Sequence, residues 1–235
     1  TDSTNLEQTI PDIHKHPDLW GMEFKQNICM KTHFMLSNDM PLVNQTLAFI
    51  FIIRHPMDVM ISNLNYSYLT NSLELSEEDK KKFSDQYIND FITHKGDPRW
   101  VENKMGSWVE NVQSWFSARN ELANVILRYE DMLSNPENEL SKINILLNLN
   151  KSEEDIKIAV ESSSFKSMKS IENQEIEQKK DGFFYSDKEH KGRDLGYRFM
   201  NRGQKGEGQE MLSQSQRDAF ADAFGDISKQ LGYEL

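Results

Sequence analysis

The residues with the clearest capacity for chemistry follow an apolar run. Residues 46–53 (TLAFIFII) lead without a spacer into Arg54, and Pro56 then opens a helical pattern that carries Ser62. A helix start offers unpaired backbone N–H groups and a partial positive charge, which favour a bound anion, especially a phosphate. Arg54 can approach such an anion with its planar guanidinium, and Ser62 can donate a hydroxyl. An Arg after a buried strand more often pairs with a nearby Asp or Glu, so this stretch alone leaves both interpretations open.

A second polar pair stands in the KTH of residues 31–33. Lys31 and His33 alternate, so on an extended chain they project onto one face. A single His is usually structural. A His beside a Lys, at the end of a strand and near an anion site, predicts a base with a charge stabiliser. This second pattern favours the functional interpretation of Arg54.

These residues can lie close together only if the strands that carry them end at the same edge of a sheet. Short apolar runs predict strands at 27–33, 46–53 and 124–131, and the unbroken second run is typical of a strand covered on both faces. Helical spacing and caps predict helices at 76–96, 106–120 and 213–235, and others that begin at Pro56, Pro136 and Ser152. This alternation predicts the α/β class, a parallel sheet flanked by helices on both faces, with ligands at the carboxyl ends of the strands.

One long segment departs from this pattern. Residues 172–208 are polar, contain six glycines and show almost no apolar periodicity. Such a composition predicts a long functional or partly mobile loop.

Composition limits the function classes. The 235 residues are enough for one sizeable core, so we expect a single domain over 1–235. The net charge of −11 argues against non-specific binding to nucleic acid or an anionic membrane. A single cysteine, Cys29, excludes an internal disulfide, and we expect a reducing compartment, the cytoplasm. No Asp, Glu or His cluster has metal-ligand spacing, and the HKH of residues 14–16 is typical of an exposed segment.

Six motifs occur in an order that resembles one known family. They are KTH, FIIRHPMDVMIS, GSW, ILRYEDM, SSFKSMK and FMNRGQKGE, and they span nearly the whole chain. The chain resembles the sulfotransferases that use 3′-phosphoadenosine-5′-phosphosulfate, and the closing AFADAFGDISKQLGYEL is similar to the family's last helix. The resemblance implies a P-loop-like nucleotide-binding fold, transfer of a sulfuryl group to a hydroxyl of a small-molecule acceptor, and no metal.

The resemblance also implies roles for the matched residues. His33 would remove the proton from the acceptor hydroxyl, and Lys31 would neutralise charge on the sulfuryl group and the bridging oxygen. The 3′-phosphate would be held by Arg54, Ser62, Arg202 and Gly203. The adenine would be framed by Tyr129 and Phe165, with Ser163 near its edge. The product would be 3′-phosphoadenosine-5′-phosphate, and a homodimer is left open.

The match is incomplete at its start. The family normally has a loop resembling PKSGTTW, whose backbone amides cradle the 5′-phosphosulfate, and no such loop precedes KTH. Because the chain opens on Thr1, we expect a truncation upstream; the alternative is a non-catalytic relative that binds the nucleotide but has lost the loop. Asn201 also stands where the cytosolic animal members usually carry an Arg. A phosphoryl-transfer enzyme would need a Mg²⁺ site and a phosphate loop, and neither is visible in the sequence.

Overall fold

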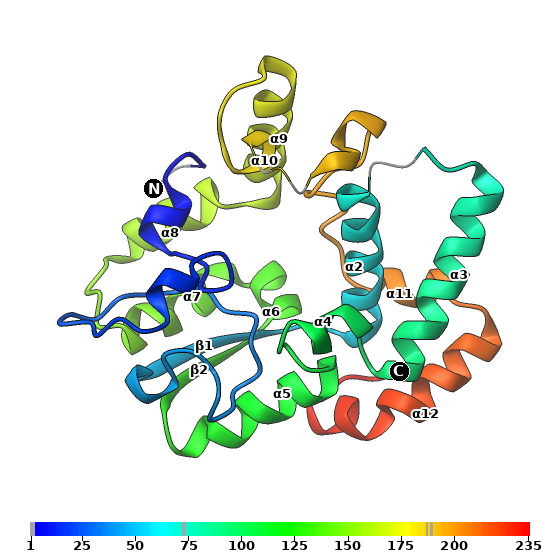
Figure 1. Cartoon of the computed structure of the whole chain (residues 1–235). Coiled ribbons are helices and arrows are strands. Elements are labelled where there is room, and N and C mark those ends of the chain that lie inside the picture. The colour runs from blue at the N-terminus through cyan, green and yellow to red at the C-terminus, as the bar shows by residue number, and fades with distance from the viewer. Residues whose placement is uncertain (1–2, 72–73, 187, 189) are drawn as a thin grey trace.

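The computed structural model describes residues 3–71, 74–186, 188 and 190–235 (Figure 1). In chain order the elements are α1 (Leu6–Thr9), η1 (Pro17–Leu19), η2 (Val43–Gln45), β1 (Ala48–Ile53), α2 (Pro56–Thr70), α3 (Glu77–His94), α4 (Pro98–Glu102), α5 (Trp108–Ser117), η3 (Ala118–Asn120), β2 (Ala123–Arg128), α6 (Tyr129–Ser134), α7 (Pro136–Leu146), α8 (Glu153–Ser162), α9 (Phe165–Gln178), α10 (Phe183–Ser186), η4 (Lys191–Leu195), α11 (Glu207–Met211) and α12 (Gln214–Gln230), where η marks a 3₁₀-helix.

Two of the three predicted strands form the sheet. β1 and β2 pair in parallel, with a register that runs from Ala48 opposite Ala123 to Ile53 opposite Arg128. The prediction of a strand at 27–33 was wrong. In this segment only Lys31 makes a bridge, to Asp12, and most of the side chains are exposed. A strand needs a repeating ladder and a buried face, and this segment has neither.

Helices lie on both sides of this sheet, as predicted. Phe49 and Phe51 point toward Trp115 of α5, at ring-centroid distances of 5.0 and 6.2 Å. α7 contacts β2 and lies across the sheet from α5 (Figure 1). β1 itself is not covered on both faces as expected, because Ile50 and Ile52 are 36% and 53% exposed.

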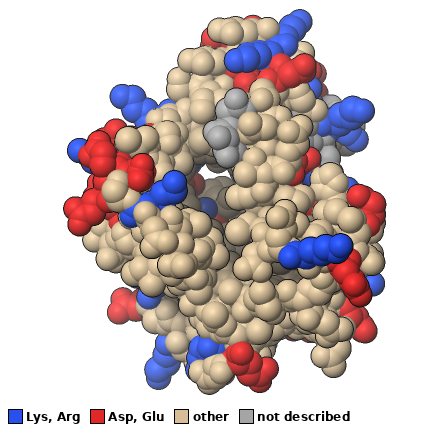
Figure 2. Space-filling model, turned by 90° about the vertical axis from the view of Figure 1, so that its left-hand side faces the viewer, with Lys and Arg blue, Asp and Glu red and all other residues tan. Residues whose placement is uncertain are grey.

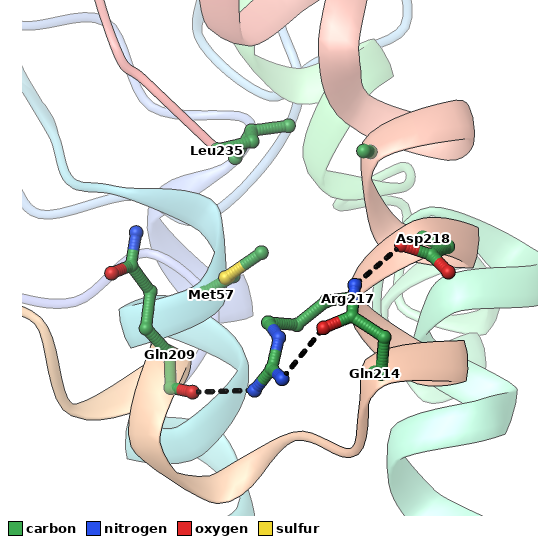
Figure 3. Close-up of a pocket in the computed structure, with 7 residues that line it drawn as sticks. Met57, Gln209, Gln214, Arg217, Asp218 and Leu235 are labelled. Carbon is green, nitrogen blue, oxygen red and sulfur yellow. Dashed lines mark hydrogen bonds between the residues drawn. The ribbon is translucent and has the colours of Figure 1, made fainter.

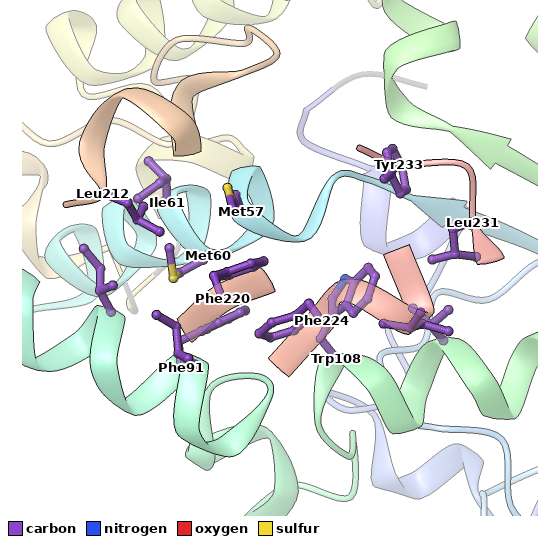
Figure 4. Close-up of a cluster of buried hydrophobic side chains, with 14 of the residues drawn as sticks. Met57, Met60, Ile61, Phe91, Trp108, Leu212, Phe220, Phe224, Leu231 and Tyr233 are labelled. Atoms are coloured by element: carbon purple, nitrogen blue, oxygen red, sulfur yellow. The ribbon is translucent and has the colours of Figure 1, made fainter. Parts of the chain in front are cut away.

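The larger hydrophobic core joins α2, α3, α5 and α12 (Figure 4). Pro56 begins α2 as predicted, with the His55 imidazole accepting a hydrogen bond from the backbone N–H of Met57. Phe220 and Phe224 of α12 stack at 4.2 Å, and Phe224 also stacks on Phe91 of α3. Phe220 and Phe224 are one turn apart on α12, so they lie on the buried face that its apolar spacing predicts. The core therefore fixes α2 behind the end of β1.

The prediction of a long loop at 172–208 was wrong in part. α9 continues to Gln178, and the rest contains α10, η4 and the start of α11. The buried side of α9 includes Glu172 and Glu175, whose carboxylates accept backbone N–H groups of residues 199–200 and 184–185. Apolar periodicity misses a helix whose buried face is acidic.

No helix in the described ranges is long and apolar enough to cross a membrane.

Candidate active site

The register of the sheet places two predicted site residues side by side. Ile53 pairs with Arg128, so the residues that follow, Arg54 and Tyr129, leave adjacent strand ends. The guanidinium carbon of Arg54 lies 4.4 Å from the centroid of the Tyr129 ring, which is cation–π geometry. This pair marks the carboxyl edge of the sheet, where ligands of parallel sheets bind.

A loop made of residues 201–206 lies against Arg54 and the start of α2. The Nη2 of Arg54 donates to the backbone oxygen of Gln204 at 2.8 Å. Asp58, in the first turn of α2, accepts the backbone N–H groups of Gly206 at 2.8 Å and Gly208 at 3.0 Å. Asp58 is buried, and its carboxylate fixes the loop from beneath. Asp58 is not among the predicted site residues; it is an acidic residue in a first helical turn, four residues after Arg54.

Both interpretations of Arg54 have support. Its Nη2 lies 3.9 Å from the Oδ2 of Asp58, an ion pair without good hydrogen-bond geometry. Its Nε is buried and has no hydrogen-bond partner among the described residues. A buried guanidinium N–H that lacks an acceptor costs free energy, and a bound anion would supply the acceptor.

The other end of the loop lies on α9. Gly203 has φ +64°, and a Cβ on it would overlap the ring of Phe165, so glycine is required there on two grounds. Lys169 lies over the same ring, with Nζ 5.5 Å from the centroid, and donates to the backbone oxygen of Asn201 at 3.1 Å. The loop therefore connects the predicted adenine contact, Phe165, with the Arg54 edge.

Three further predicted residues lie apart from these contacts. Ser62 is exposed on α2. Ser163 ends α8, and its hydroxyl donates to the backbone oxygen of Ala159 at 2.7 Å. Arg202 is 57% exposed in its side chain and lies 3.9 Å from Glu207. Within the described ranges, no hydrogen bond or ion pair joins any of the three to Arg54.

Lys31 and His33 meet at a carboxylate that the sequence analysis did not assign. The Oδ2 of Asp12 lies 2.9 Å from the Nζ of Lys31 and 3.8 Å from the Nε2 of His33. Asp12 is buried, whereas the Lys31 and His33 side chains are each 50% exposed. Two cationic or potentially cationic groups therefore share one buried anion, with their ends open to a ligand.

The position of His33 is set by α5. Ser107 and Glu110 form a capping box that starts this helix. Asn111 then donates to the backbone oxygen of His33 at 3.1 Å, and the indole N–H of Trp115 donates to that of Phe34 at 3.0 Å. The GSW motif thus begins the helix that supports the KTH segment.

Charge and burial act against each other in this cluster. Although half of the His33 side chain is exposed, the packing around its other half removes water from the imidazole and lowers its pKa. The positive charge of Lys31 lowers the pKa further and Asp12 raises it, with the result that the pKa is about 4. For Asp12, burial works to raise the pKa, but the hydrogen bonds from His14 and Lys31 outweigh it and the pKa is lowered. At neutral pH His33 is therefore uncharged and able to accept a proton.

Six of the nine predicted residues form two groups. One contains Arg54, Tyr129, Gly203 and Phe165, and the other contains Lys31 and His33 with Asp12; no hydrogen bond or ion pair joins the groups in the described ranges. The side that carries the N-terminal segment in Figure 1 is hollowed near its middle (Figure 2). The described residues contain no cluster of three or more His, Cys, Asp or Glu able to hold a metal ion.

A separate cavity of about 390 Å³ lies beside α11 and α12 (Figure 3). Three of its polar side chains, those of Arg217, Gln214 and Asp218, are already paired, since Arg217 donates to the backbone oxygen of Gln209 at 3.2 Å and to the side chain of Gln214 at 2.9 Å. Gln214 in turn donates to Asp218 at 2.8 Å. None of its lining residues is a predicted site residue.

A family model for the sulfotransferase domain matches residues 11–232. The chain belongs to the sulfotransferase domain family. A curated relative, Sulfotransferase 1A1 of Mus musculus, is 29% identical over 141 residues, which are 60% of this chain and 44% of the relative. The chain thus spans about half the length of the curated relatives it matches.

Solved sulfotransferase-like structures share this fold. Mouse sulfotransferase SULT7A1 complexed with PAP superposes with a TM-score of 0.65 at 22% identity, over 92% of this chain and 70% of that one. Retinol dehydratase in complex with androsterone and inactive cofactor PAP gives a TM-score of 0.64 at 19% identity, over 93% and 57% of the two chains. The predicted family and α/β fold class are confirmed.

Proposed function

We propose that this sulfotransferase chain moves a sulfuryl group from 3′-phosphoadenosine-5′-phosphosulfate to a hydroxyl of a small-molecule acceptor. The observation that carries the proposal is Arg54, at the carboxyl edge of the sheet, with a buried Nε that lacks a partner among the described residues. The neighbouring loop and Tyr129 enclose the same group. An anion with aromatic surfaces nearby is what a phosphorylated adenosine offers.

Different residues would bind the 3′-phosphate and the adenine. Arg54, Ser62, Arg202 and Gly203 would hold the 3′-phosphate, the two arginines as cations and Gly203 through its backbone. The adenine would lie against Tyr129 and Phe165, with Ser163 at its edge. The loop of residues 201–206 already touches Phe165 at one end and Arg54 at the other, which supports a single nucleotide reaching both.

His33 and Lys31 would carry the chemistry. His33 takes the proton of the acceptor hydroxyl while the acceptor oxygen forms its bond to sulfur in line with the leaving oxygen. Lys31 neutralises the charge that develops as the bond from sulfur to the 5′-phosphate oxygen breaks and the phosphate leaves with the electron pair. The products are a sulfate ester and 3′-phosphoadenosine-5′-phosphate.

One element of the family's donor site is absent from the printed chain. No Gly-rich loop with a following Lys precedes KTH, so the groups that would hold the 5′-phosphosulfate are not among these residues. The alternative function is that of a nucleotide-binding relative that has lost this loop and has no turnover. We place either form in the cytoplasm, with a small-molecule acceptor and no nucleic acid or membrane partner for the catalytic form.

Calorimetric titration with 3′-phosphoadenosine-5′-phosphate, compared with 5′-AMP, tests the nucleotide site. We expect a preference for the bisphosphate that Arg54→Ala reduces by roughly 10- to 100-fold, the range of a charge-assisted hydrogen bond. Arg119→Ala, which removes an exposed guanidinium on η3, is the matched control and should leave the preference unchanged. Equal losses for both nucleotides in Arg54→Ala would remove the 3′-phosphate assignment.

Sulfuryl transfer separates the two candidates. If the chain binds the bisphosphate and forms a sulfate ester from a hydroxyl acceptor, it is the catalytic form. If it binds the bisphosphate but transfers nothing even when upstream sequence with a 5′-phosphosulfate loop is supplied, the non-catalytic form is correct.

A further inference from the structure

Asp12 is the residue in this part of the chain whose burial is hardest to explain by packing alone. Its side chain is 8% exposed, yet it carries a charge held by three groups. The Oδ1 accepts the backbone N–H of His14 at 3.1 Å, and the Oδ2 faces both Lys31 and His33. A buried carboxylate needs partners, and here its two side-chain partners on Oδ2 are the two residues proposed for the chemistry.

The backbone holds Asp12 in this position. Lys31 donates its N–H to the oxygen of Pro11 at 2.9 Å, and Ile13 donates to the oxygen of Lys31 at 3.0 Å. The ring of His14 stacks on Phe34 at 3.6 Å. These contacts on both sides of Asp12 fix its distance to the KTH segment, so the shared carboxylate is a built feature and not a chance approach of two surface side chains.

We propose that Asp12 is a positioning residue that serves Lys31 and His33 in turn: it holds the Lys31 ammonium until a sulfuryl group draws Lys31 away, and then turns to His33 and strengthens it as a base. This proposal rests on the proposed function. It adds a coupling between donor binding and proton transfer through a residue outside the matched motifs.

The distances explain why the exchange is favourable. The Nζ of Lys31 is within hydrogen-bond distance of Asp12, at 2.9 Å, whereas the Nε2 of His33 at 3.8 Å is too far for a hydrogen bond. Once Lys31 faces the sulfuryl oxygens, the Oδ2 of Asp12 is free, and rotation of the Asp12 side chain alone brings it to His33. The proton then moves from the acceptor hydroxyl to the imidazole, and the resulting imidazolium lies against a carboxylate.

The surroundings of His33 define which charges matter. The groups that act on its pKa are Asp12, which raises it, and Lys31, His14 and Lys15, which lower it. From α5 the nearest contact is the neutral amide of Asn111. Lys15 is an internal control, because its Nζ pairs with Glu7 at 3.0 Å, and the hydrogen bond from its backbone N–H to the oxygen of Asp12 at 2.9 Å does not depend on the side chain.

NMR titration of the His33 imidazole tests the proposal without nucleotide or acceptor. Lys31→Gln imitates the removal of Lys31 from Asp12 and should raise the His33 pKa, while Asp12→Asn should lower it. In the Asp12→Asn background, the rise caused by Lys31→Gln should shrink by on the order of one unit, because no carboxylate remains to turn to His33. Lys15→Gln removes the same charge and should cause the same small rise in both backgrounds.

The double substitution decides the outcome. A smaller rise in the Asp12→Asn background supports the shared counterion, and an equal rise in both backgrounds overturns it, because Lys31 would then act only through its own charge. The amide spectrum of each variant verifies the fold. Since the titration needs no donor, failure of nucleotide binding would count against the proposed function and leave the result for Asp12 standing.

Discussion

Asp58 offers the sharpest test of how the nucleotide side of the site is assembled. Its two carboxylate oxygens accept the N–H groups of Gly206 and Gly208 at 2.8 and 3.0 Å, and its side chain is 1% exposed. In Asp58→Ala both N–H groups lose their acceptor in a region where water does not readily replace it. Hydrogen bonds to a charged group contribute about 1.5–3 kcal/mol each, so for two bonds we expect a loss of about 3–6 kcal/mol in the free energy of unfolding.

The Asp58→Ala substitution should also weaken nucleotide binding. The loop that Asp58 anchors carries Arg202 and Gly203, and the oxygen of Gln204 receives the Arg54 guanidinium. Without the anchor the loop must be ordered when the ligand binds, which costs affinity. We expect the affinity for 3′-phosphoadenosine-5′-phosphate to fall roughly 10-fold or more.

Urea unfolding and calorimetry measure the two effects. Asp58→Asn keeps one acceptor oxygen and should fall between Asp58→Ala and the unchanged protein in both measurements. Asp222→Ala, which removes an exposed aspartate of α12, is the matched control and should change stability by less than about 0.5 kcal/mol. If Asp58→Ala unfolds at the same urea concentration as the control, the anchoring role is refuted.

The other predictions concern single contacts. Gly203→Ala places a methyl group into the Phe165 ring at φ +64°, so bisphosphate affinity should drop in calorimetry, and an unchanged affinity would contradict the packing. His33→Ala should abolish sulfuryl transfer and leave bisphosphate binding intact; retained transfer would remove His33 as the base. Because burial and Lys31 lower the pKa of His33 to about 4, its base form persists well below pH 6.5, and kcat/KM should fall only as the pH drops toward 4.

The sequence predicts the parts of the site that depend on local signals. An apolar run followed by Arg54 and Pro56 indicates a strand end and a helix start, because both depend on residues that are neighbours in the chain. The pairing of Arg54 with Tyr129 follows from two strands being parallel and in register. The apolar run in residues 27–33 predicts a strand, and nothing in those residues shows that the segment lacks a buried face and a partner strand.

Contacts between residues that are far apart in the sequence cannot be predicted from such local signals. Asp58 binds backbone groups about 150 residues away, and its sequence context shows only an acidic residue in a first helical turn. Glu172 similarly meets Phe199 and Met200, and its burial conceals a helix from any search for apolar periodicity. Asp12 precedes the KTH segment by about twenty residues with no pattern to join them. The prediction of one domain over 1–235 stays a prediction.

The two groups of site residues are held by different contacts, so a substitution in one group should leave the other unaffected. The nucleotide group gathers Arg54, Tyr129, Phe165 and Gly203 from four distant segments, so its geometry depends on the sheet register and on the Asp58 anchor. The base group lies within residues 11–34 and is supported by α5. Because no described hydrogen bond joins the groups, substitutions at Asp58 and Asp12 should add independently. The first should change the affinity for 3′-phosphoadenosine-5′-phosphate without moving the His33 titration. The second should move that titration without changing the affinity for this nucleotide, which has no sulfuryl group to draw Lys31 from Asp12.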